Sequence, residues 1–201
     1  MLAGAELISD WCDLFPLNEE VLSQCCPFKC GDKDLDDFFC HDVEKFSMQL
    51  LGKSFCFRLK ADSSVIVCAF TLSTSSLDVR HLPRSRKEKL TKSIPHEKSL
   101  SSYPAALVGR LGVSSAYQGK GVGRALLENI IKPMFFDFFI GCRYLTVDAY
   151  NNVATLKFYE TSGFLPLFST EQQEKEYIGM PAEKHLRTRL LYFDLIRLYY
   201  Q

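Results

Sequence analysis

Residues 113–124 read VSSAYQGKGVGR and are the most informative stretch of the chain. An apolar run ends at Val113, glycines follow at alternate positions from Gly119 to Gly123, and an amphipathic helical pattern begins inside this turn. A glycine-rich turn that opens a helix presents backbone N–H groups backed by the positive end of the helix dipole, which favours phosphate binding. Lys120 and Arg124 add positive charge. The stretch therefore predicts a phosphate-binding strand–turn–helix unit.

Two common phosphate-binding loops do not fit this stretch. A Walker A loop requires G-x-x-x-x-G-K-[ST], but here the lysine at position 120 is followed by Gly121. A dinucleotide-binding fingerprint requires G-x-G-x-x-G, and a count that starts at Gly119 places Arg124 where the third glycine belongs. Both nucleotide-binding classes are therefore excluded for this loop.

Residues 118–123 match the pattern Q/R-x-x-G-x-G/A. With this match the chain resembles the GNAT superfamily of acetyl-CoA-dependent N-acetyltransferases, in which such a loop grips the CoA pyrophosphate. Residues 110–113 resemble the bulged strand beside the pantetheine arm, and glycines 109 and 112 inside the strand indicate a bulge or a close approach of a ligand. Residues 152–164 resemble the superfamily's N…FYxxxGF segment. The resemblance is closest over residues 107–166.

The resemblance implies that the chain moves an acetyl group from acetyl-CoA onto a primary amine, by direct attack of the amine on the thioester. Tyr159 occupies the position of the catalytic acid that protonates the departing thiolate, and a phenol with a pKa near 10 is protonated at neutral pH. A backbone N–H of Gly112 or Val113 would stabilise the carbonyl oxygen. The residues expected to bind the cosubstrate are Leu111, Gly112, Val113, Gln118, Gly119, Lys120, Gly121, Val122, Gly123, Arg124, Asn152 and Phe158.

Several roles in this site have alternatives. Tyr159 would otherwise be an aromatic packing residue of its helix. Asn151 competes with Asn152 for the CoA contact, and either residue is also suited to cap the helix. No general base is evident: the candidates are Asp148, Glu160, His96 and Asp78, and many enzymes of the superfamily leave this task to water.

The hydrophobic pattern predicts a mixed α/β sheet with helices on its faces, and the resemblance implies a predominantly antiparallel GNAT-type sheet with splayed central strands. Pro133 is expected to kink its helix or to begin a second segment. We expect one domain over residues 1–201, with an acetyl-CoA-binding core at about 105–166. The expected elements are strands at 5–8, 54–60, 65–72, 105–113, 144–149 and 187–195, and helices at 35–50, 84–92, 121–132 and 152–161.

A narrower resemblance concerns the acceptor. Residues 28–38 read FKCGDKDLDDF and resemble the F-x-C-G…L-D-x-F segment of toxin acetyltransferases from toxin–antitoxin pairs, as do residues 109–113 and the long segment before Tyr103. These enzymes acetylate aminoacyl-tRNA, so the resemblance implies tRNA as acceptor, an antitoxin as partner, and the basic residues 80–98 as the surface that faces tRNA. The alternatives are an unassigned amine acceptor and, for residues 80–98, a solvated linker helix.

Composition sets the remaining expectations. The 24 basic and 24 acidic residues balance, so net charge draws the chain neither to nucleic acid nor to anionic membranes. Residues 1–10 resemble no secretory signal and residues 134–140 are too short to span a bilayer, which predicts a cytoplasmic protein with no membrane partner. The eight cysteines are then expected to be reduced thiols, with no metal site. Residues 190–200 are either core or the edge of a homodimer. A CoA-binding regulatory module without transferase activity and a metal-dependent Cys/His module are the alternative classes.

Overall fold

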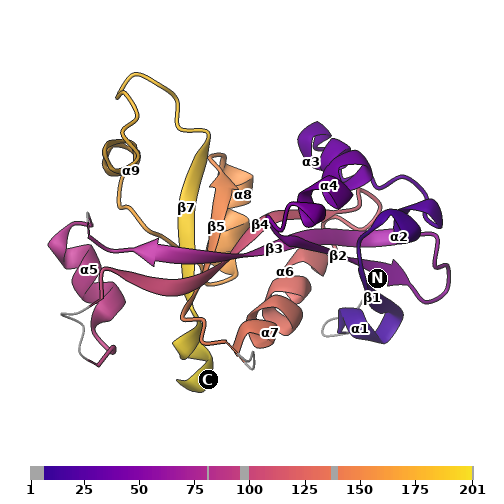
Figure 1. Cartoon of the computed structure of the whole chain (residues 1–201), viewed down its shortest axis with the longest axis horizontal. Coiled ribbons are helices and arrows are strands. Elements are labelled where there is room, and N and C mark those ends of the chain that lie inside the picture. The colour runs from indigo at the N-terminus through magenta and orange to yellow at the C-terminus, as the bar shows by residue number, and fades with distance from the viewer. Residues whose placement is uncertain (1–6, 81, 96–99, 137–139, 201) are drawn as a thin grey trace. The chain divides into compact units, whose positions relative to one another are not determined.

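The computed structural model describes residues 7–80, 82–95, 100–136 and 140–200. Within these residues it contains one seven-stranded sheet with the strand order β1-β2-β3-β4-β5-β7-β6 (Figure 1). The pairs β1–β2, β2–β3, β5–β7 and β6–β7 are antiparallel and β4–β5 is parallel, which confirms the predicted mixed, mainly antiparallel sheet. The strands are β1 Cys12–Pro16, β2 Lys53–Leu59, β3 Ile66–Asp78, β4 Ser102–Val113, β5 Tyr144–Tyr150, β6 Leu165–Pro166 and β7 Thr188–Asp194.

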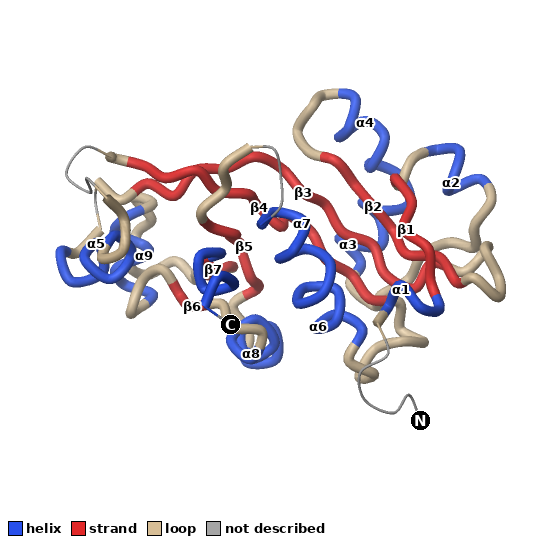
Figure 2. Tube along the Cα trace, turned by 90° about the horizontal axis from the view of Figure 1, so that it is seen from below, coloured by secondary structure: helices blue, strands red, loops and turns tan. Residues whose placement is uncertain are grey.

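Helical segments alternate with these strands along the chain (Figure 2). Two of them, η1 and η3, are π-helical turns set between α-helical segments, and η4 is a 3₁₀ helix. No helix in the described part of the chain has the length and apolar content that crossing a bilayer requires. The segments are α1 Ile8–Trp11, α2 Glu19–Ser23, α3 Lys33–Asp37, η1 Phe38–Asp42, α4 Val43–Met48, α5 Arg84–Thr91, α6 Val122–Leu126, η3 Leu127–Ile131, α7 Lys132–Phe136, α8 Val153–Thr161, α9 Glu171–Tyr177 and η4 Leu195–Tyr200.

The internal contacts of the chain group into two compact units. Unit 1 comprises residues 1–73 and 108–134, and unit 2 comprises residues 74–107 and 135–201. Strands β3 and β4 contribute to both units, because each continues across a unit boundary. The expectation of a single domain over residues 1–201 stays a prediction.

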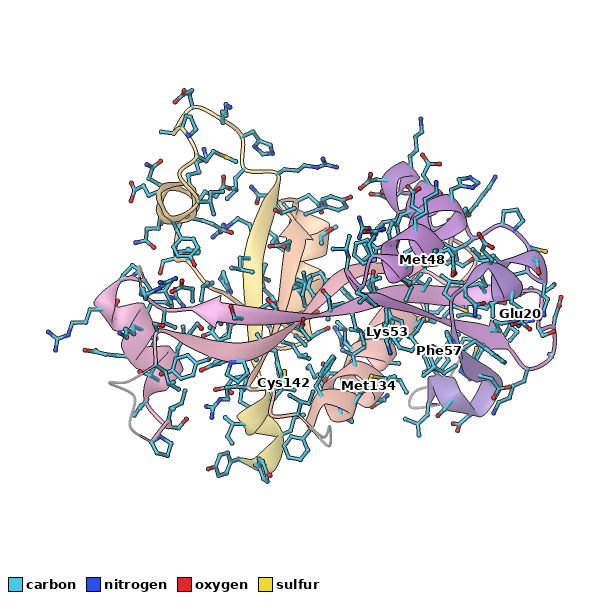
Figure 3. All side chains as sticks on the ribbon, in the orientation of Figure 1. Glu20, Met48, Lys53, Phe57, Met134 and Cys142 are labelled. Atoms are coloured by element: carbon cyan, nitrogen blue, oxygen red, sulfur yellow. The ribbon has the colours of Figure 1, made fainter. Side chains whose placement is uncertain are left out.

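Unit 1 is built on the antiparallel strands β1, β2 and the first part of β3. Figure 1 shows α3 and α4 on one face of these strands and α1 and α6 on the other. Phe57 of β2 is 2% exposed, whereas Met48 at the end of α4 is 73% exposed (Figure 3). The core combines apolar residues of the N-terminal helices with those of the strands: Leu17, Val21, Phe28, Cys30, Phe38, Phe39, Val43, Cys56, Ile66 and Ala69. The predicted amphipathic helix is thus confirmed as the layer that covers one face.

Unit 2 is built on β5 and β7, which pair from Tyr144 with Asp194 to Tyr150 with Thr188. The hydroxyl of Tyr144 donates a hydrogen bond to the carbonyl oxygen of Leu90 at 2.8 Å and so ties α5 to β5. Glu174 of α9 forms a buried ion pair with Arg189 of β7 at 2.6 Å. The basic helix α5, expected at 84–92, is confirmed at Arg84–Thr91.

Two predicted elements differ from the structure near the ends of unit 1's helices. The strand expected at 5–8 is wrong for its described part, because Ile8 begins helix α1, whose first turn is closed by a hydrogen bond from the Leu7 N–H to Asp10 Oδ2 at 3.0 Å. Residues 5 and 6 lie outside the described residues. Leu50, expected on the apolar face of a helix, follows α4 with φ 56° and is 90% exposed. A helix ends where its chain turns into the left-handed region, so the apolar spacing overran the helix by two residues.

The helix after the glycine-rich stretch continues past its proline. The segments α6, η3 and α7 follow one another without a break, and Pro133 is the second residue of α7. A proline lacks the N–H that an α-helix needs, and the π-helical turn η3 changes the hydrogen-bond spacing just before it. The expected second segment is therefore present, and it begins one residue earlier than Pro133.

Candidate functional site

The predicted site residues fall into two groups, one in each unit. The first group surrounds residues 114–121, which we call the glycine loop, between β4 and α6 in unit 1. Gly119 and Gly121 have φ values of 72° and 82°, a region that residues with a Cβ rarely adopt. A Cβ added at either glycine would meet no heavy atom within 4 Å among the described residues. The glycines are thus required by backbone conformation, and the space beside them is open.

The backbone of the glycine loop leaves N–H groups available at the start of α6. The amides of Tyr117 and Gln118 donate to the carbonyl oxygen of Ser114 at 2.7 and 3.1 Å. The helical ladder then begins with the N–H of Ala125 donating to the carbonyl oxygen of Gly121 at 2.9 Å. The first N–H groups of a helix have no partner within the helix, so they are positioned to donate to an anion. This geometry agrees with the predicted phosphate-binding role.

Two polar side chains of the glycine loop, Gln118 and Lys120, donate hydrogen bonds to different backbone carbonyl groups. Gln118 Nε2 donates to the carbonyl oxygens of Cys30 at 2.6 Å and Val113 at 3.0 Å, so its amide nitrogen holds the loop together. Lys120 Nζ donates to the carbonyl oxygen of Ala116 at 2.7 Å and lies over the ring of Tyr117. Arg124 is exposed on the first turn of α6, whereas Val122 and Gly123 are buried. Whether these residues bind CoA stays a prediction, and Val122 and Gly123 would contribute backbone only.

The end of β4 lies against the N-terminal segment. A Cβ on Gly112 would come within 3.1 Å of the Phe28 ring and 3.4 Å of Cys30 Sγ. Gly112 therefore permits a close approach of Phe28, a contact from within the protein, whereas Gly109 has no heavy atom within 4 Å of an added Cβ among the described residues. Leu111 and Val113 are half-buried beside it. The sequence pattern indicated a close approach at Gly112 but did not identify Phe28 as the neighbour.

The second group of predicted residues lies on and before α8 in unit 2. Asn152 is the N-cap of this helix, and its Oδ1 accepts a hydrogen bond from the Thr155 N–H at 2.9 Å. Asn151 Nδ2 instead donates to the carbonyl oxygen of Leu186 at 2.8 Å, which joins it to the segment before β7. The capping alternative is thus observed for Asn152. Its side-chain nitrogen has no hydrogen bond among the described residues and could still contact a ligand.

Tyr159 is buried on α8 and surrounded by aromatic rings. Its side chain is 6% exposed, and its ring lies 4.9 Å from that of Phe158 and 5.5 Å from that of Phe164, both edge-on. Burial raises the pKa of Tyr159 above the ordinary tyrosine value. Its hydroxyl has no hydrogen-bond partner among the described residues. Tyr159 is thus both a packing residue and a phenol that stays protonated at neutral pH, as a proton donor must be.

The four candidate general bases differ in their surroundings. Asp78 accepts hydrogen bonds from Arg80, with 2.5 Å between its Oδ2 and the Arg80 Nη2, so its carboxylate is already engaged. Asp148 on β5 is exposed, but the surrounding protein raises the pKa of its carboxyl group by desolvation. Glu160 is exposed on α8, and His96 lies outside the described residues. Desolvation thus favours the protonated form of the Asp148 carboxyl group, as a proton acceptor requires.

The cysteines are separate thiols in the structure. All eight are free, and the described residues contain no group of three or more His, Cys, Asp or Glu side chains arranged to hold a metal ion. Burial raises the pKa of Cys30 to about 11, and it also raises the pKa of Cys40. Both thiols are therefore protonated at neutral pH.

Part of the sequence matches a known family, and the fold is similar to that of solved structures. Residues 90–164 match the model of the acetyltransferase (GNAT) family. No curated protein matches the sequence. A mutant of KacT has a similar structure, with a TM-score of 0.69, 18% identity, and coverage of 94% of this chain and 98% of that chain. AtaT complexed with acetyl-methionyl-tRNAfMet is also similar, with a TM-score of 0.66, 19% identity, and coverage of 94% of this chain and 99% of that chain. AtaTR bound with AcCoA has a TM-score of 0.65 and 21% identity, with coverage of 96% of this chain and 99% of that chain.

Proposed function

We propose that this chain is an acetyl-CoA-dependent N-acetyltransferase, which the match of residues 90–164 to the acetyltransferase (GNAT) family model supports, and that its acceptor is the amino group of an aminoacyl-tRNA. The observation that carries the proposal is the likeness in fold, over 94% of this chain, to AtaT complexed with acetyl-methionyl-tRNAfMet.

The glycine loop fits the diphosphate of CoA. Its left-handed glycines leave open space beside the backbone, and the N–H groups at the start of α6 have no partner within the helix. The exposed guanidinium of Arg124 adds positive charge at the same helix start. We assign the loop to the diphosphate and the β4 residues Leu111, Gly112 and Val113 to the pantetheine arm.

The reaction requires one new bond, one broken bond and two proton transfers. The neutral amine attacks the thioester carbonyl, so that a C–N bond forms and the C–S bond breaks. A backbone N–H at Gly112 or Val113 stabilises the charge on the carbonyl oxygen, and the Tyr159 hydroxyl donates a proton to the departing sulfur. The proton lost by the amine passes to water or to Asp148, whose raised pKa favours this role.

The basic helix α5 is the surface that we propose for tRNA. Arg84 is paired with Glu88 at 2.8 Å, and Arg80 is paired with Asp78. No ion pair engages Lys87, Lys89 or Lys92 within the described residues, so three ammonium groups remain for phosphates on one short segment. This local charge supports nucleic-acid binding although the net charge of the chain is zero.

A toxin-like function on aminoacyl-tRNA also implies a protein partner and a cellular compartment. The Y144F mutant of the toxin AtaT has been solved bound to the C-terminus of the antitoxin AtaR, and KacTA has been solved in complex with DNA. We propose an antitoxin as a partner of this chain and the cytoplasm, where tRNA is charged, as its location. Tyr199 and Tyr200 are 71% and 84% exposed at the end of η4, which keeps this tail as the candidate edge of a homodimer.

The acceptor is tested with labelled acetyl-CoA, the purified chain and a pool of aminoacylated tRNA. We expect label on the charged tRNA, released as an N-acetyl amino acid when the ester is hydrolysed, and no label on the same tRNA after it is deacylated. Consumption of acetyl-CoA without label on tRNA would contradict the proposed acceptor and direct the search to small amines and protein amino groups.

The surface is tested with a charge-matched pair of variants. Replacing Lys87, Lys89 and Lys92 by Gln should raise the KM for tRNA roughly tenfold and flatten its dependence on salt, because each lost phosphate contact reduces the number of counterions released. Replacing Lys33, Lys53 and Lys184, which are exposed elsewhere, removes the same charge and should leave the KM unchanged. Equal effects of the two triple variants would indicate a general effect of charge and contradict a role for α5.

A further inference from the structure

The N-terminal segment Phe28–Gly31 lies directly under the glycine loop of unit 1. The carbonyl oxygen of Lys29 accepts hydrogen bonds from the Ser115 N–H at 3.0 Å and from Ser115 Oγ at 3.3 Å. The carbonyl oxygen of Cys30 accepts the hydrogen bond from Gln118 Nε2 at 2.6 Å. Three hydrogen bonds therefore join two consecutive carbonyl groups to a loop that lies more than 80 residues later in the chain.

Asp36 holds this segment from the other side. Its Oδ1 accepts the hydrogen bond of the Cys30 N–H at 2.6 Å. Among the described residues no lysine or arginine forms an ion pair with Asp36, and its carboxylate interacts with both the N–H and the thiol of Cys30, whose pKa it helps to raise. A hydrogen bond to an ionised acceptor is about twice as strong as one between neutral groups. The peptide of Cys30 is thus fixed at its N–H by Asp36 and at its carbonyl by Gln118.

Packing reinforces the same connection. The Phe28 side chain is 2% exposed, and its ring lies edge-on to the ring of Phe39, with 5.5 Å between the ring centroids. A Cβ placed on Gly112 would have atoms of the Phe28 ring as its nearest neighbours. Cys40 Sγ donates to the carbonyl oxygen of Phe28 at 3.5 Å. The segment is therefore held between the helices α3–η1 and the end of β4, with little freedom to move away from the loop.

We propose that Asp36 is a positioning residue for acetyl-CoA binding, acting through the Cys30 peptide and Gln118 on the shape of the glycine loop. This assigns a structural role to the spacing F-x-C-G-x₃-L-D at residues 28–36, in which the aspartate fixes the peptide that contacts the loop. The inference rests on the proposed function only in taking the glycine loop as the diphosphate site. Gln118 then acts mainly on the loop's conformation, through the nitrogen that joins Cys30 to Val113.

The first readout requires no ligand. Hydrogen–deuterium exchange of the free protein is compared for wild type, Asp36→Ala, Asp36→Asn and the control Asp37→Ala, which removes a neighbouring exposed carboxylate of the same helix. We expect Asp36→Ala to speed exchange of the Ser115 and Gln118 amides roughly tenfold, the effect of one charge-assisted hydrogen bond. Asp36→Asn keeps an acceptor oxygen for the Cys30 N–H and should restore most of the protection, and Asp37→Ala should match wild type.

The second readout is the Kd for acetyl-CoA by calorimetry. Asp36→Ala should weaken binding by roughly tenfold, while the KM for the acceptor and kcat at saturating acetyl-CoA stay near their wild-type values. Failure of wild type to bind acetyl-CoA would contradict both the proposed function and the role of Asp36 in that binding, whereas normal binding by wild type and by Asp36→Ala would contradict the present inference alone. Unchanged loop exchange in Asp36→Ala, the same change in Asp37→Ala, or acceleration spread evenly over the strands of unit 1 would each overturn it.

Discussion

The glycine loop and helix α8 are both assigned to acetyl-CoA, but they use different parts of the polypeptide. In the loop, the decisive features are backbone conformations at Gly119 and Gly121 and N–H groups at the start of α6. On α8, the decisive feature is one side chain, the buried phenol of Tyr159. The proposed role of the loop therefore depends on residues that lack a side chain. The proposed role of the helix depends on the hydroxyl group of Tyr159, which another aromatic ring of the same shape would not supply.

This difference predicts how each region fails. A substitution in the loop should change the affinity for acetyl-CoA, because it alters the shape that receives the diphosphate. A substitution of Tyr159 should change the rate and leave the affinity intact, because the proton is needed only as the C–S bond breaks. Affinity, rate and stability must therefore be measured separately for each variant.

Replacing Tyr159 by Phe should give the largest effect. The variant removes the hydroxyl and keeps the ring that packs against Phe158 and Phe164. We expect kcat to fall by about 10²-fold or more, the typical contribution of a general acid, with the Kd for acetyl-CoA unchanged. Steady-state kinetics and calorimetry on the same preparation measure both. A variant with normal kcat would reduce Tyr159 to a packing residue.

The pH dependence of kcat tests the same phenol without a mutation. Burial penalises the phenolate, so the pKa of Tyr159 lies above its ordinary value and the acid form persists to higher pH than in an exposed tyrosine. No decline in kcat due to Tyr159 is therefore expected between pH 7 and about pH 10. An alkaline decline below this range that disappears in Tyr159→Phe would show that the phenol ionises early.

Replacing Gly121 by Ala should have an intermediate effect on binding. A Cβ in the left-handed region costs about 1–2 kcal/mol, so the loop is expected to leave this conformation and to bind acetyl-CoA roughly tenfold more weakly. Gly179→Ala is the matched control, since Gly179 has φ 68° and open space around its Cβ position in a turn between α9 and β7. Both variants should lose similar stability in urea. An equal loss of affinity in the two would contradict the assignment of the loop.

Replacing Asn152 by Ala should have the smallest effect. Asn152 and Thr170 both cap helices of unit 2 by accepting an N–H of the first turn, so Asn152→Ala and Thr170→Ala should each lose about 1 kcal/mol of stability. If Asn152 also contacts CoA, as the resemblance implies, only its variant raises the KM for acetyl-CoA, by roughly threefold, the size of one weak hydrogen bond. Equal KM values would leave Asn152 as a cap alone.

Local patterns account for the elements that were predicted well. The β2–β3 hairpin and helix α5 have clear periodicity or composition over their own residues, and Gly163, with φ 80°, follows the end of α8 as a helix stop should. Helix α9 was missed because Glu171–Tyr177 has no apolar stripe, and it is fixed by the Glu174–Arg189 ion pair. A buried charge pair of this kind depends on tertiary contact, which a local pattern does not contain.

The candidate site shows the same limit. The loop glycines were identified from their spacing, since a positive φ is a property of single residues, and the structure places Gly119 and Gly121 in that region. The support beneath the loop was not identified, although its residues had been noted for their resemblance to toxin enzymes. The contacts of Lys29 and Cys30 with Ser115 and Gln118 join segments far apart in the chain, and only folding brings them together.

The close contact at Gly112 also constrains how this protein can diverge. Because a Cβ at this position would come within 3.1 Å of the Phe28 ring, the two positions are not free to vary independently. In a descendant that acquires alanine at position 112, the ring at position 28 would have to shift by a few tenths of an ångström or be replaced by a smaller side chain. We therefore expect positions 112 and 28 to vary together among relatives, a covariation that would reveal this contact and that a single sequence does not show.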